Sequence, residues 1–181
     1  MANNLNQNYT FNSFVVDEGN ELVFAVAQAI VKKPLKYNPF FLYGKWRSGK
    51  THLLYAIREA ITKETNSKSR ILYVTGEQFH TALLNAHREK KISDFIKLYQ
   101  SHDVVMIDNI EAYLDEWKID TQKSIMEVID SLVNNGRQVI ITSELQPERL
   151  PVIHEHFRST YQCGIMVDML PIEKVVSSEV G

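Results

Sequence analysis

Residues 40–51 read FFLYGKWRSGKT, in which four apolar or aromatic residues precede a segment that satisfies the pattern G-x-x-x-x-G-K-[S/T] at every position. The apolar residues predict a buried strand over Phe40–Tyr43. The periodic apolar residues that follow predict a helix over Thr51–Thr65. A strand, a glycine-bearing loop and a helix in this order form the setting in which the pattern binds phosphate. The stretch therefore predicts a P-loop NTPase fold.

The chemistry of this loop follows from its residue types. Glycines let backbone N–H groups close round an anion, Lys50 supplies a charge for the β- and γ-phosphates, and Thr51 offers a hydroxyl to Mg²⁺. We therefore expect ATP or ADP with Mg²⁺ as cofactors, with Lys50 also acting in catalysis. The nucleotide would contact the whole loop (Gly44, Lys45, Trp46, Arg47, Ser48, Gly49, Lys50 and Thr51). A chance match in a turn is the alternative, and it would need both flanks to be right by accident.

The remaining chain alternates strand-like and helix-like segments, which predicts a three-layer α/β fold with a parallel sheet. Strands such as VVMI are continuously apolar, as expected when helices cover both faces. The further strands are expected at Arg70–Val74, Val104–Ile107, Gln138–Thr142 and Gly164–Asp168. The helices are expected at Asn20–Val31, Glu77–Arg88, Ile92–Tyr99 and Asp120–Asn134, with Gly136 as a stop signal after the last.

Bulk properties fit one domain of 181 residues, with a core over residues 1–173 and a frayed tail over 174–181. The net charge of −2 argues against a dedicated nucleic-acid module, although it leaves room for a local basic patch. The chain has one cysteine, no secretory signal and no apolar run long enough to cross a bilayer. We expect a cytoplasmic protein without membrane contact.

Asp108 follows the apolar strand Val104–Ile107 and is the expected second element of a P-loop site. It would orient Thr51 or a water on Mg²⁺, so the predicted metal site consists of Thr51 and Asp108. A helix-capping aspartate at a strand end is the alternative. The presence of the P-loop favours the metal-binding interpretation, in which Asp108 is the Walker B residue.

The residue after Asp108 departs from the usual chemistry of this site. ATPases of this class carry an acid there to polarise the attacking water, whereas this chain has Asn109. An amide can orient a water but cannot accept its proton at neutral pH. Glu111 could compensate, but a surface carboxylate is the interpretation that we favour for it. Asn109 is still expected in the catalytic site.

Thr142, Ser143 and Glu144 close the fourth predicted strand. Ligands of open α/β sheets bind at the carboxyl ends of strands. We therefore expect Ser143 and Glu144 to sense the γ-phosphate and to act in catalysis. The alternative for each is a strand that ends in ordinary turn-forming residues.

Taken together, the residues resemble the AAA+ ATPase domain of the bacterial replication initiator DnaA, in order from about residue 5 to residue 172. The amino-terminal pattern N-x-x-Y-T-F-x-x-F-V is far more specific than a P-loop alone. The resemblance is carried by Leu5-Asn6, Tyr9–Phe11, Phe14–Val16, Asn20, Tyr37–Pro39, Gly49–Leu54, Thr121-Gln122, Arg158-Ser159 and Gly164.

The resemblance implies a sheet of five parallel strands in which the sensor strand lies between the two Walker strands. It also implies that Phe14, Val15 and Asn20 border the adenine and that His52 belongs to the nucleotide site. The helix pair within Glu77–Tyr99 would match an initiator-specific insertion that lines a DNA channel in assembled DnaA filaments. A solvated helix face is the interpretation that we prefer for its basic residues (His87, Arg88, Lys90, Lys91 and Lys97), since Glu89 and Asp94 interrupt them.

Several departures from the family limit what the resemblance implies. Asp17 stands for an expected glycine, Glu21 for a basic residue, and Thr160 for the arginine finger, with His156 where another arginine is usual. The sequence also ends where the helical lid is expected to begin. We favour a short paralogue over an excised fragment.

Two functional hypotheses remain. The first is an ATP-binding, DnaA-like protein that acts in the initiation or regulation of replication, with weak hydrolysis and a DnaA-type initiator or other replication protein as partner. A head-to-tail oligomer fits this hypothesis. The alternative is a helicase-loader ATPase of the DnaC or IstB type that acts on single-stranded DNA. A scaffold that no longer binds nucleotide is disfavoured by the intact loop.

Overall fold

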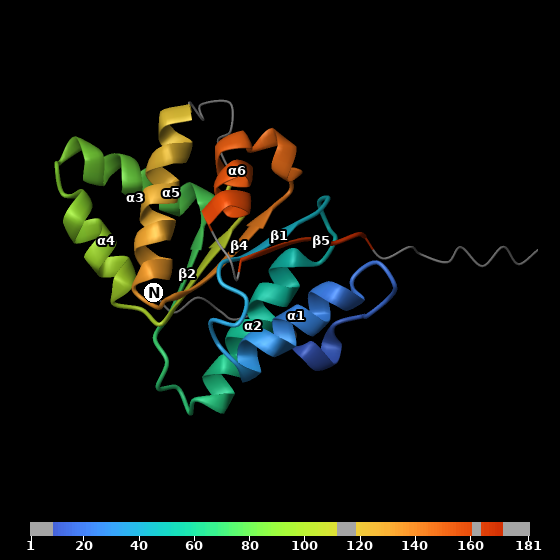
Figure 1. Ribbon diagram of the computed structural model, residues 1–181. Coiled ribbons are helices and arrows are strands. Elements are labelled where there is room, and N and C mark those ends of the chain that lie inside the picture. The colour runs from blue at the N-terminus through green and yellow to red at the C-terminus, as the bar shows by residue number, and fades with distance from the viewer. Residues whose placement is uncertain (1–8, 112–118, 161–163, 172–181) are drawn as a thin grey trace, which may run out of the picture.

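The computed structural model describes residues 9–111, 119–160 and 164–171 of the chain (Figure 1). These residues contain one parallel sheet in the order β2-β3-β4-β1-β5. All the predicted strands are confirmed, with ends that shift by a residue at most. The sheet consists of β1 (Phe40–Tyr43), β2 (Ile71–Thr75), β3 (Val104–Asp108), β4 (Gln138–Ser143) and β5 (Ile165–Asp168).

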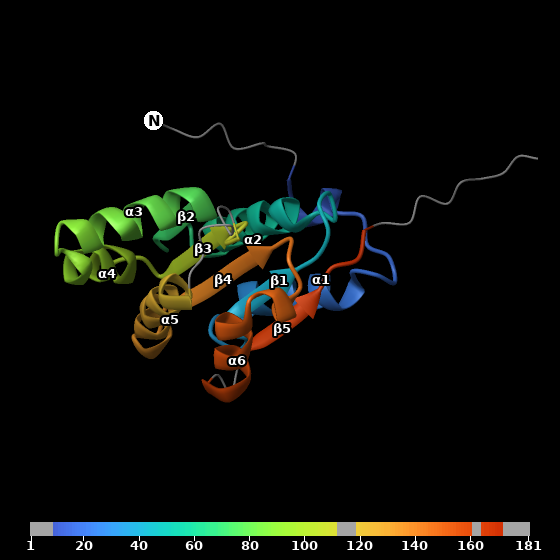
Figure 2. The ribbon, with the colours of Figure 1, turned by 90° about the horizontal axis from the view of Figure 1, so that it is seen from above.

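Helices form a layer on each face of the sheet, so the predicted three-layer α/β fold is confirmed (Figure 2). Helices α1 and α2 cover one face, and α3 to α6 cover the other. The α-helices are α1 (Glu21–Lys32), α2 (Lys50–Glu64), α3 (Gly76–Arg88), α4 (Ile92–Gln100), α5 (Ile119–Asn134) and α6 (Pro151–Thr160). Two short 3₁₀ helices, η1 (Phe11–Ser13) and η3 (Pro147–Arg149), complete the described elements.

The central strands are buried along their whole length because each supplies side chains to both cores. In β3, Val105 and Ile107 pack under α3 to α6, whereas Val104 and Met106 pack under α1 and α2. This alternation explains why VVMI is continuously apolar. The strand β4 lies between β1 and β3, as the family resemblance implied.

One helix, α6, was not predicted from the sequence. Its buried residues Ile153 and Phe157 lie four positions apart and face the core, and Pro151 occupies its first position. A proline at a helix start followed by this spacing is a signal that could have revealed the helix. The predicted stop at Gly136 is confirmed, since this glycine has φ +66° and follows α5.

Among the described residues, no helix combines the length and the apolar character that a bilayer crossing requires. The predicted frayed tail, residues 174–181, lies outside the described residues.

Candidate nucleotide-binding site

The loop Gly44–Gly49 joins β1 to α2 and is fixed at both ends. The backbone N–H of Gly44 donates to the carbonyl of Ser143, at 3.1 Å, which holds the start of the loop against β4. A Cβ at Gly44 would lie 2.3 Å from the carbonyl oxygen of Met169, so only glycine fits. Gly49 precedes α2 with φ +103°, a backbone conformation that favours glycine. The first N–H groups of α2 have no carbonyl partner within the helix and therefore point toward an anion site.

Lys50, the first residue of α2, is 4% exposed. Its Nζ donates to the carbonyl oxygens of Gly44 at 2.7 Å and Lys45 at 3.0 Å. Burial lowers the pKa of Lys50, while the carboxylates of Glu144, Glu111 and Asp108 act against this shift. The ammonium group is therefore held by its own loop within a field of three carboxylates.

Asp108 accepts hydrogen bonds from three hydroxyl groups. Thr51 Oγ1 donates to Oδ2 at 2.9 Å, and Thr142 Oγ1 donates to Oδ1 at 2.6 Å. The third donor is Tyr73, whose hydroxyl lies 2.7 Å from Oδ2. The structure thus brings Thr51 and Asp108 together, and their oxygens are of the type that Mg²⁺ prefers.

Tyr73 was missed by the sequence analysis. It lies in β2, and burial and the neighbouring Asp108 raise the pKa of its hydroxyl, so this group stays a donor. The sequence signal was a phenol in the predicted strand Arg70–Val74, but no prediction placed that strand next to the one that ends at Asp108. Because β2 and β3 are paired in register, this side chain can reach the carboxylate.

Hydrogen bonds donated by backbone N–H groups join the carboxyl ends of β3 and β4. Asn109 has φ +54°, and its N–H donates to Thr142 Oγ1 at 2.9 Å. The N–H of Ile110 donates to the carbonyl of Thr142 at 2.9 Å. The N–H of Glu144 donates to Oε1 of Glu111 at 2.7 Å. Asn109 and Glu144 are therefore held beside the P-loop.

The interpretation of Glu111 as a surface carboxylate is wrong. One of its oxygens accepts the hydrogen bond from Glu144, and the other, Oε2, is buried and accepts no hydrogen bond from any described residue. Burial raises the pKa of this carboxyl group, and the hydrogen bonds that it accepts oppose the shift. The side chain turned inward because it binds the backbone at the end of β4, a contact between segments that the sequence does not reveal.

Two serines of the predicted site are buried. Ser143 Oγ accepts a hydrogen bond from the N–H of Leu145, at 3.0 Å, within the turn that follows β4. Ser48 Oγ is buried in the P-loop and makes no hydrogen bond to any described residue. An unpartnered hydroxyl in a phosphate-binding loop fits a bound polyanion, which would supply acceptors there.

The amino-terminal segment lies against the P-loop and α2. His52 Nε2 lies 3.0 Å from the carbonyl oxygen of Thr10 and 3.2 Å from Ser13 Oγ, so this histidine holds the segment in place. A Cβ on Gly49 would lie 3.4 Å from Phe14, so this ring borders the loop. Asn20 is 1% exposed, and its side-chain amide donates to the carbonyl of Val15 at 3.1 Å. Val15 itself is exposed.

The tip of the P-loop is exposed at three consecutive residues, Lys45, Trp46 and Arg47. The Arg47 guanidinium lies 4.3 Å from the Trp46 ring centroid, and Arg47 has φ +63°. The structure thus places all eight loop residues together, but it turns three of these side chains toward solvent.

The basic residues of α3, α4 and the turn between them lie far from the P-loop along the chain, on an exposed surface that includes His87, Arg88 and Lys90. Lys91 pairs with Glu89 at 2.8 Å. In α6, His156 Nε2 lies 2.9 Å from both carboxylate oxygens of Asp130 in α5. This histidine therefore joins two helices on the same face of the sheet.

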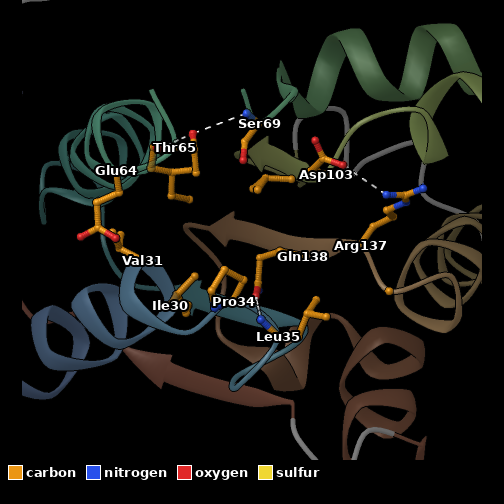
Figure 3. Close-up of a pocket in the computed structure, with 13 residues that line it drawn as sticks. Ile30, Val31, Pro34, Leu35, Glu64, Thr65, Ser69, Asp103, Arg137 and Gln138 are labelled. Carbon is orange, nitrogen blue, oxygen red and sulfur yellow. Dashed lines mark hydrogen bonds and ion pairs between the residues drawn. The ribbon is translucent and has the colours of Figure 1, made fainter. Parts of the chain in front are cut away.

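A separate cavity of about 170 Å³ lies at the amino-terminal edge of the sheet (Figure 3). Apolar residues such as Ile30 and Val31 line it together with the paired side chains of Asp103 and Arg137. No residue of the predicted nucleotide site lines this cavity. The predicted site lies instead at the opposite, carboxyl-terminal edge.

Comparisons with known proteins agree with this geometry. A family model described as the bacterial DnaA ATPase domain matches residues 5–168. The chromosomal replication initiator protein DnaA of Kosmotoga olearia is 37% identical over 175 residues. That match covers 96% of this chain but 38% of the relative, so the chain spans well under half of the relative's length.

Among solved structures, domain III of the Thermotoga maritima replication initiation protein DnaA has a TM-score of 0.78 and 29% identity, covering 91% of this chain and 68% of that one. A replication initiator DnaA bound to AMPPCP and single-stranded DNA has a TM-score of 0.72 and 27% identity. That likeness covers 91% of this chain and 50% of the other.

A DnaC helicase loader also shares the fold, with a TM-score of 0.66 over 90% of this chain and 97% of the loader. Its sequence identity is 15%, so this likeness concerns the fold alone.

Proposed function

The chain belongs to the family of bacterial DnaA ATPase domains, and from that premise we propose that it binds ATP with Mg²⁺ and acts in the initiation or regulation of DNA replication. The observation that carries the proposal is the hydrogen bond from Thr51 to Asp108, because it joins the P-loop to the second metal-binding element. The AMPPCP bound to a DnaA structure of 27% identity supports the same ligand class. The helicase-loader alternative has less support, since the identity to the DnaC structure is 15%.

In this proposal the nucleotide's phosphates take the place of the loop carbonyls as partners of Lys50. Thr51 and Asp108 hold Mg²⁺, which neutralises phosphate charge when bound. Tyr73 and Thr142 orient the Asp108 carboxylate, and Ser143 and Glu144 lie where they can sense the γ-phosphate. The proposed adenine side of the site consists of Phe14, Val15, Asn20 and His52. The core of residues 1–173 is proposed as one functional unit.

Titration calorimetry with Mg·ATP tests the proposal. We expect Lys50→Ala to weaken binding by about 1.5–3 kcal/mol, or roughly 10- to 150-fold, because it removes a charge-assisted contact. Lys45→Ala is the matched control, since it removes an exposed cation from the same loop and leaves its backbone carbonyl in place. Equal affinity in the wild type and Lys50→Ala would refute the nucleotide site.

Hydrolysis by the isolated chain is expected to be slow. Asn109 cannot accept a proton from water, and Thr160 cannot supply the charge of an arginine finger, which contributes about 10³–10⁵ in rate. A steady-state rate near about 1 s⁻¹ for the purified chain would contradict this.

A DnaA-type protein is the proposed partner, in a head-to-tail assembly. The chain carries the nucleotide-binding residues but has Thr160 where the family carries the finger, so it can accept a neighbour's finger without activating the subunit beyond it. We expect co-sedimentation with a full-length DnaA in ATP, but much less in ADP or with Lys50→Ala. Equal association in ATP, in ADP and with Lys50→Ala would refute the idea. Thr160→Arg should stimulate ATP hydrolysis only if this face of the chain docks on a neighbouring subunit.

Single-stranded DNA is a further proposed ligand, supported by the DnaA structure that contains it and by the exposed basic residues of α3, α4 and the turn between them. The effect of salt on affinity tests it. Binding that runs through Arg88 and Lys90 should weaken as salt rises and should lose part of its salt dependence in Arg88→Ala/Lys90→Ala.

A further inference from the structure

The position that supplies the catalytic acid in related ATPases holds Asn109 here, whose side chain cannot take a proton. Its backbone is fixed by φ +54° and by the hydrogen bond from its N–H to Thr142 Oγ1. Two residues separate Asp108 from Glu111, and Glu111 carries the next carboxylate along the chain. The question is whether that carboxylate belongs to the nucleotide site or only supports the fold.

The carboxylate of Glu111 lies at the carboxyl ends of β3 and β4, where the P-loop also lies. Its Oε1 accepts the N–H of Glu144 at 2.7 Å, and Glu144 directly follows β4. Its charge acts on the Lys50 ammonium, together with the charges of Glu144 and Asp108. Glu111 is therefore part of the electrostatic surroundings of the P-loop lysine.

The second carboxylate oxygen of Glu111, Oε2, shows whether this residue has only a structural role. Oε2 is buried and accepts no hydrogen bond from any residue that the structure describes. A buried polar atom without a partner costs about 1–3 kcal/mol, and more when it carries charge. The contact with Glu144 requires only one acceptor oxygen, which a glutamine would supply equally well. The fold therefore explains Oε1 but not Oε2.

We propose that Glu111 is the general base for ATP hydrolysis in this chain and takes the role that Asn109 cannot fill. The oxygen of the attacking water forms a bond to the γ-phosphorus, and the bond from that phosphorus to the bridging oxygen of ADP breaks. The proton of the water passes to the Glu111 carboxylate. Asn109 can orient the same water through its amide. This inference rests on the proposed binding of ATP.

Burial supports this chemistry because it raises the pKa of the Glu111 carboxyl group. A carboxylate whose pKa lies closer to neutral pH is a stronger base than one in water. The hydrogen bond from Glu144 holds Oε1 and leaves Oε2 as the oxygen with accepting capacity.

The test compares the wild type with Glu111→Gln, which keeps an acceptor for the Glu144 N–H and removes the base. Glu148→Gln is the matched control, because it makes the same chemical change at an exposed residue of η3 near the same edge of the sheet. Three quantities are measured for each protein: the affinities for Mg·ATP and Mg·ADP, the single-turnover rate of hydrolysis, and the affinity for ADP with aluminium fluoride, which mimics the transferring phosphoryl group.

We expect Glu111→Gln to bind ATP and ADP within about twofold of the wild type and to hydrolyse ATP about 100-fold more slowly, the typical contribution of a general base. The aluminium fluoride complex should weaken relative to ADP alone. Glu148→Gln should match the wild type throughout. A Glu111→Gln protein that binds ATP and hydrolyses it at the wild-type rate would overturn the inference, as would a wild type that binds ATP and never hydrolyses it. A wild type that does not bind ATP would refute the proposed function itself.

Discussion

Asp108 is oriented by three hydroxyl donors, Thr51, Tyr73 and Thr142, which come from three separate elements. Charge-assisted hydrogen bonds of this kind are shorter and stronger than neutral ones. The direction of the carboxylate is therefore fixed before any ligand arrives. Removal of one donor should affect both the stability of the fold and the affinity for a metal–nucleotide complex.

Tyr73→Phe removes one donor and keeps the ring in place. We expect it to lower the free energy of unfolding by about 1–3 kcal/mol, because the hydrogen bond is made to a charged group. Mg·ATP should bind less tightly, while nucleotide without Mg²⁺ should be less affected. Tyr99→Phe is the control, since it removes the hydroxyl of a buried tyrosine in α4, outside the predicted nucleotide site. Urea unfolding and calorimetry of both variants measure the effects, and equal losses would argue against the role of Tyr73.

The raised pKa of Glu111 makes stability depend on pH. Between its ordinary pKa of 4.5 and the raised value, the folded state keeps a proton that the unfolded state has lost. The stabilising contribution of the protonated Glu111 carboxyl group is therefore complete below its ordinary pKa. It is lost as the pH rises through the pKa of this group in the folded state. The stability of the wild type relative to Glu111→Gln should fall as the pH rises above about 4.5 and through the raised pKa of the folded state. Urea unfolding across this range checks it, and a constant difference would contradict the buried state of the carboxyl group.

At the scale of single residues, sequence reasoning found the groups that a motif fixes and missed those that depend on spatial neighbours. Thr51 and Asp108 were predicted together and lie 2.9 Å apart. Tyr73 was missed because its role depends on the pairing of β2 with β3. Glu111 was misjudged because its partner is the backbone of Glu144, which follows β4 and is distant from Glu111 in the sequence.

At the scale of elements, the start of α3 is packed against the loop that follows β3. A Cβ at Gly76 would lie 2.0 Å from the carbonyl oxygen of Asn109. The helix can therefore approach this loop only because its first residue lacks a side chain. This contact holds the segment that carries Asn109, Ile110 and Glu111.

Gly76→Ala tests the contact. We expect a loss of about 1–3 kcal/mol in the free energy of unfolding, as for other overpacked sites. The loop should also shift, so the affinity for Mg·ATP should fall. Gly136→Ala is a useful comparison, since no atom lies within 4 Å of its added Cβ and only its φ of +66° opposes the change. That variant should lose about 1–2 kcal/mol with unchanged nucleotide affinity. If both variants bind ATP equally well, the loop does not depend on Gly76.

The elements themselves were largely predictable, because apolar periodicity reflects burial on one or both faces. Every strand and most helices followed from it. Helix α6 was not predicted from periodicity, because it is short and its buried apolar residues, Ile153 and Phe157, give a weak pattern. It also begins just after the 3₁₀ helix η3. The family resemblance predicted that β4 lies between β1 and β3, but the places of β2 and β5 were not predicted, because periodicity carries no information on which strands are neighbours.

At the scale of the whole molecule, ligand binding and folding are linked. A ligand that binds only the folded state adds RT ln(1 + [L]/Kd) to stability, or about 2.7 kcal/mol at a concentration of 100 Kd. We expect Mg·ATP at that excess to raise the melting temperature of the wild type by several degrees, about 2–4 °C per kcal/mol for a chain of this size. Lys50→Ala should show little change, and Lys45→Ala should behave as the wild type. An equal rise in the melting temperatures of all three proteins would show that the nucleotide binds at another site.

The strand order has a consequence for how the site comes into being during synthesis. The P-loop leaves the ribosome early, but β1 pairs with β4 and β5. Phe40 can therefore pair with Ile140 and Ile165 only after these later strands have been synthesised. Contacts between such distant segments form late and limit the folding rate. Asp108 likewise gains its hydrogen bond from Thr142 only after β4 has been synthesised. A nascent chain that ends before β4 therefore carries the whole nucleotide motif without its assembled site. ATP could act as a natural probe of the last step of folding, because it can recognise only the chain whose middle strand has been inserted.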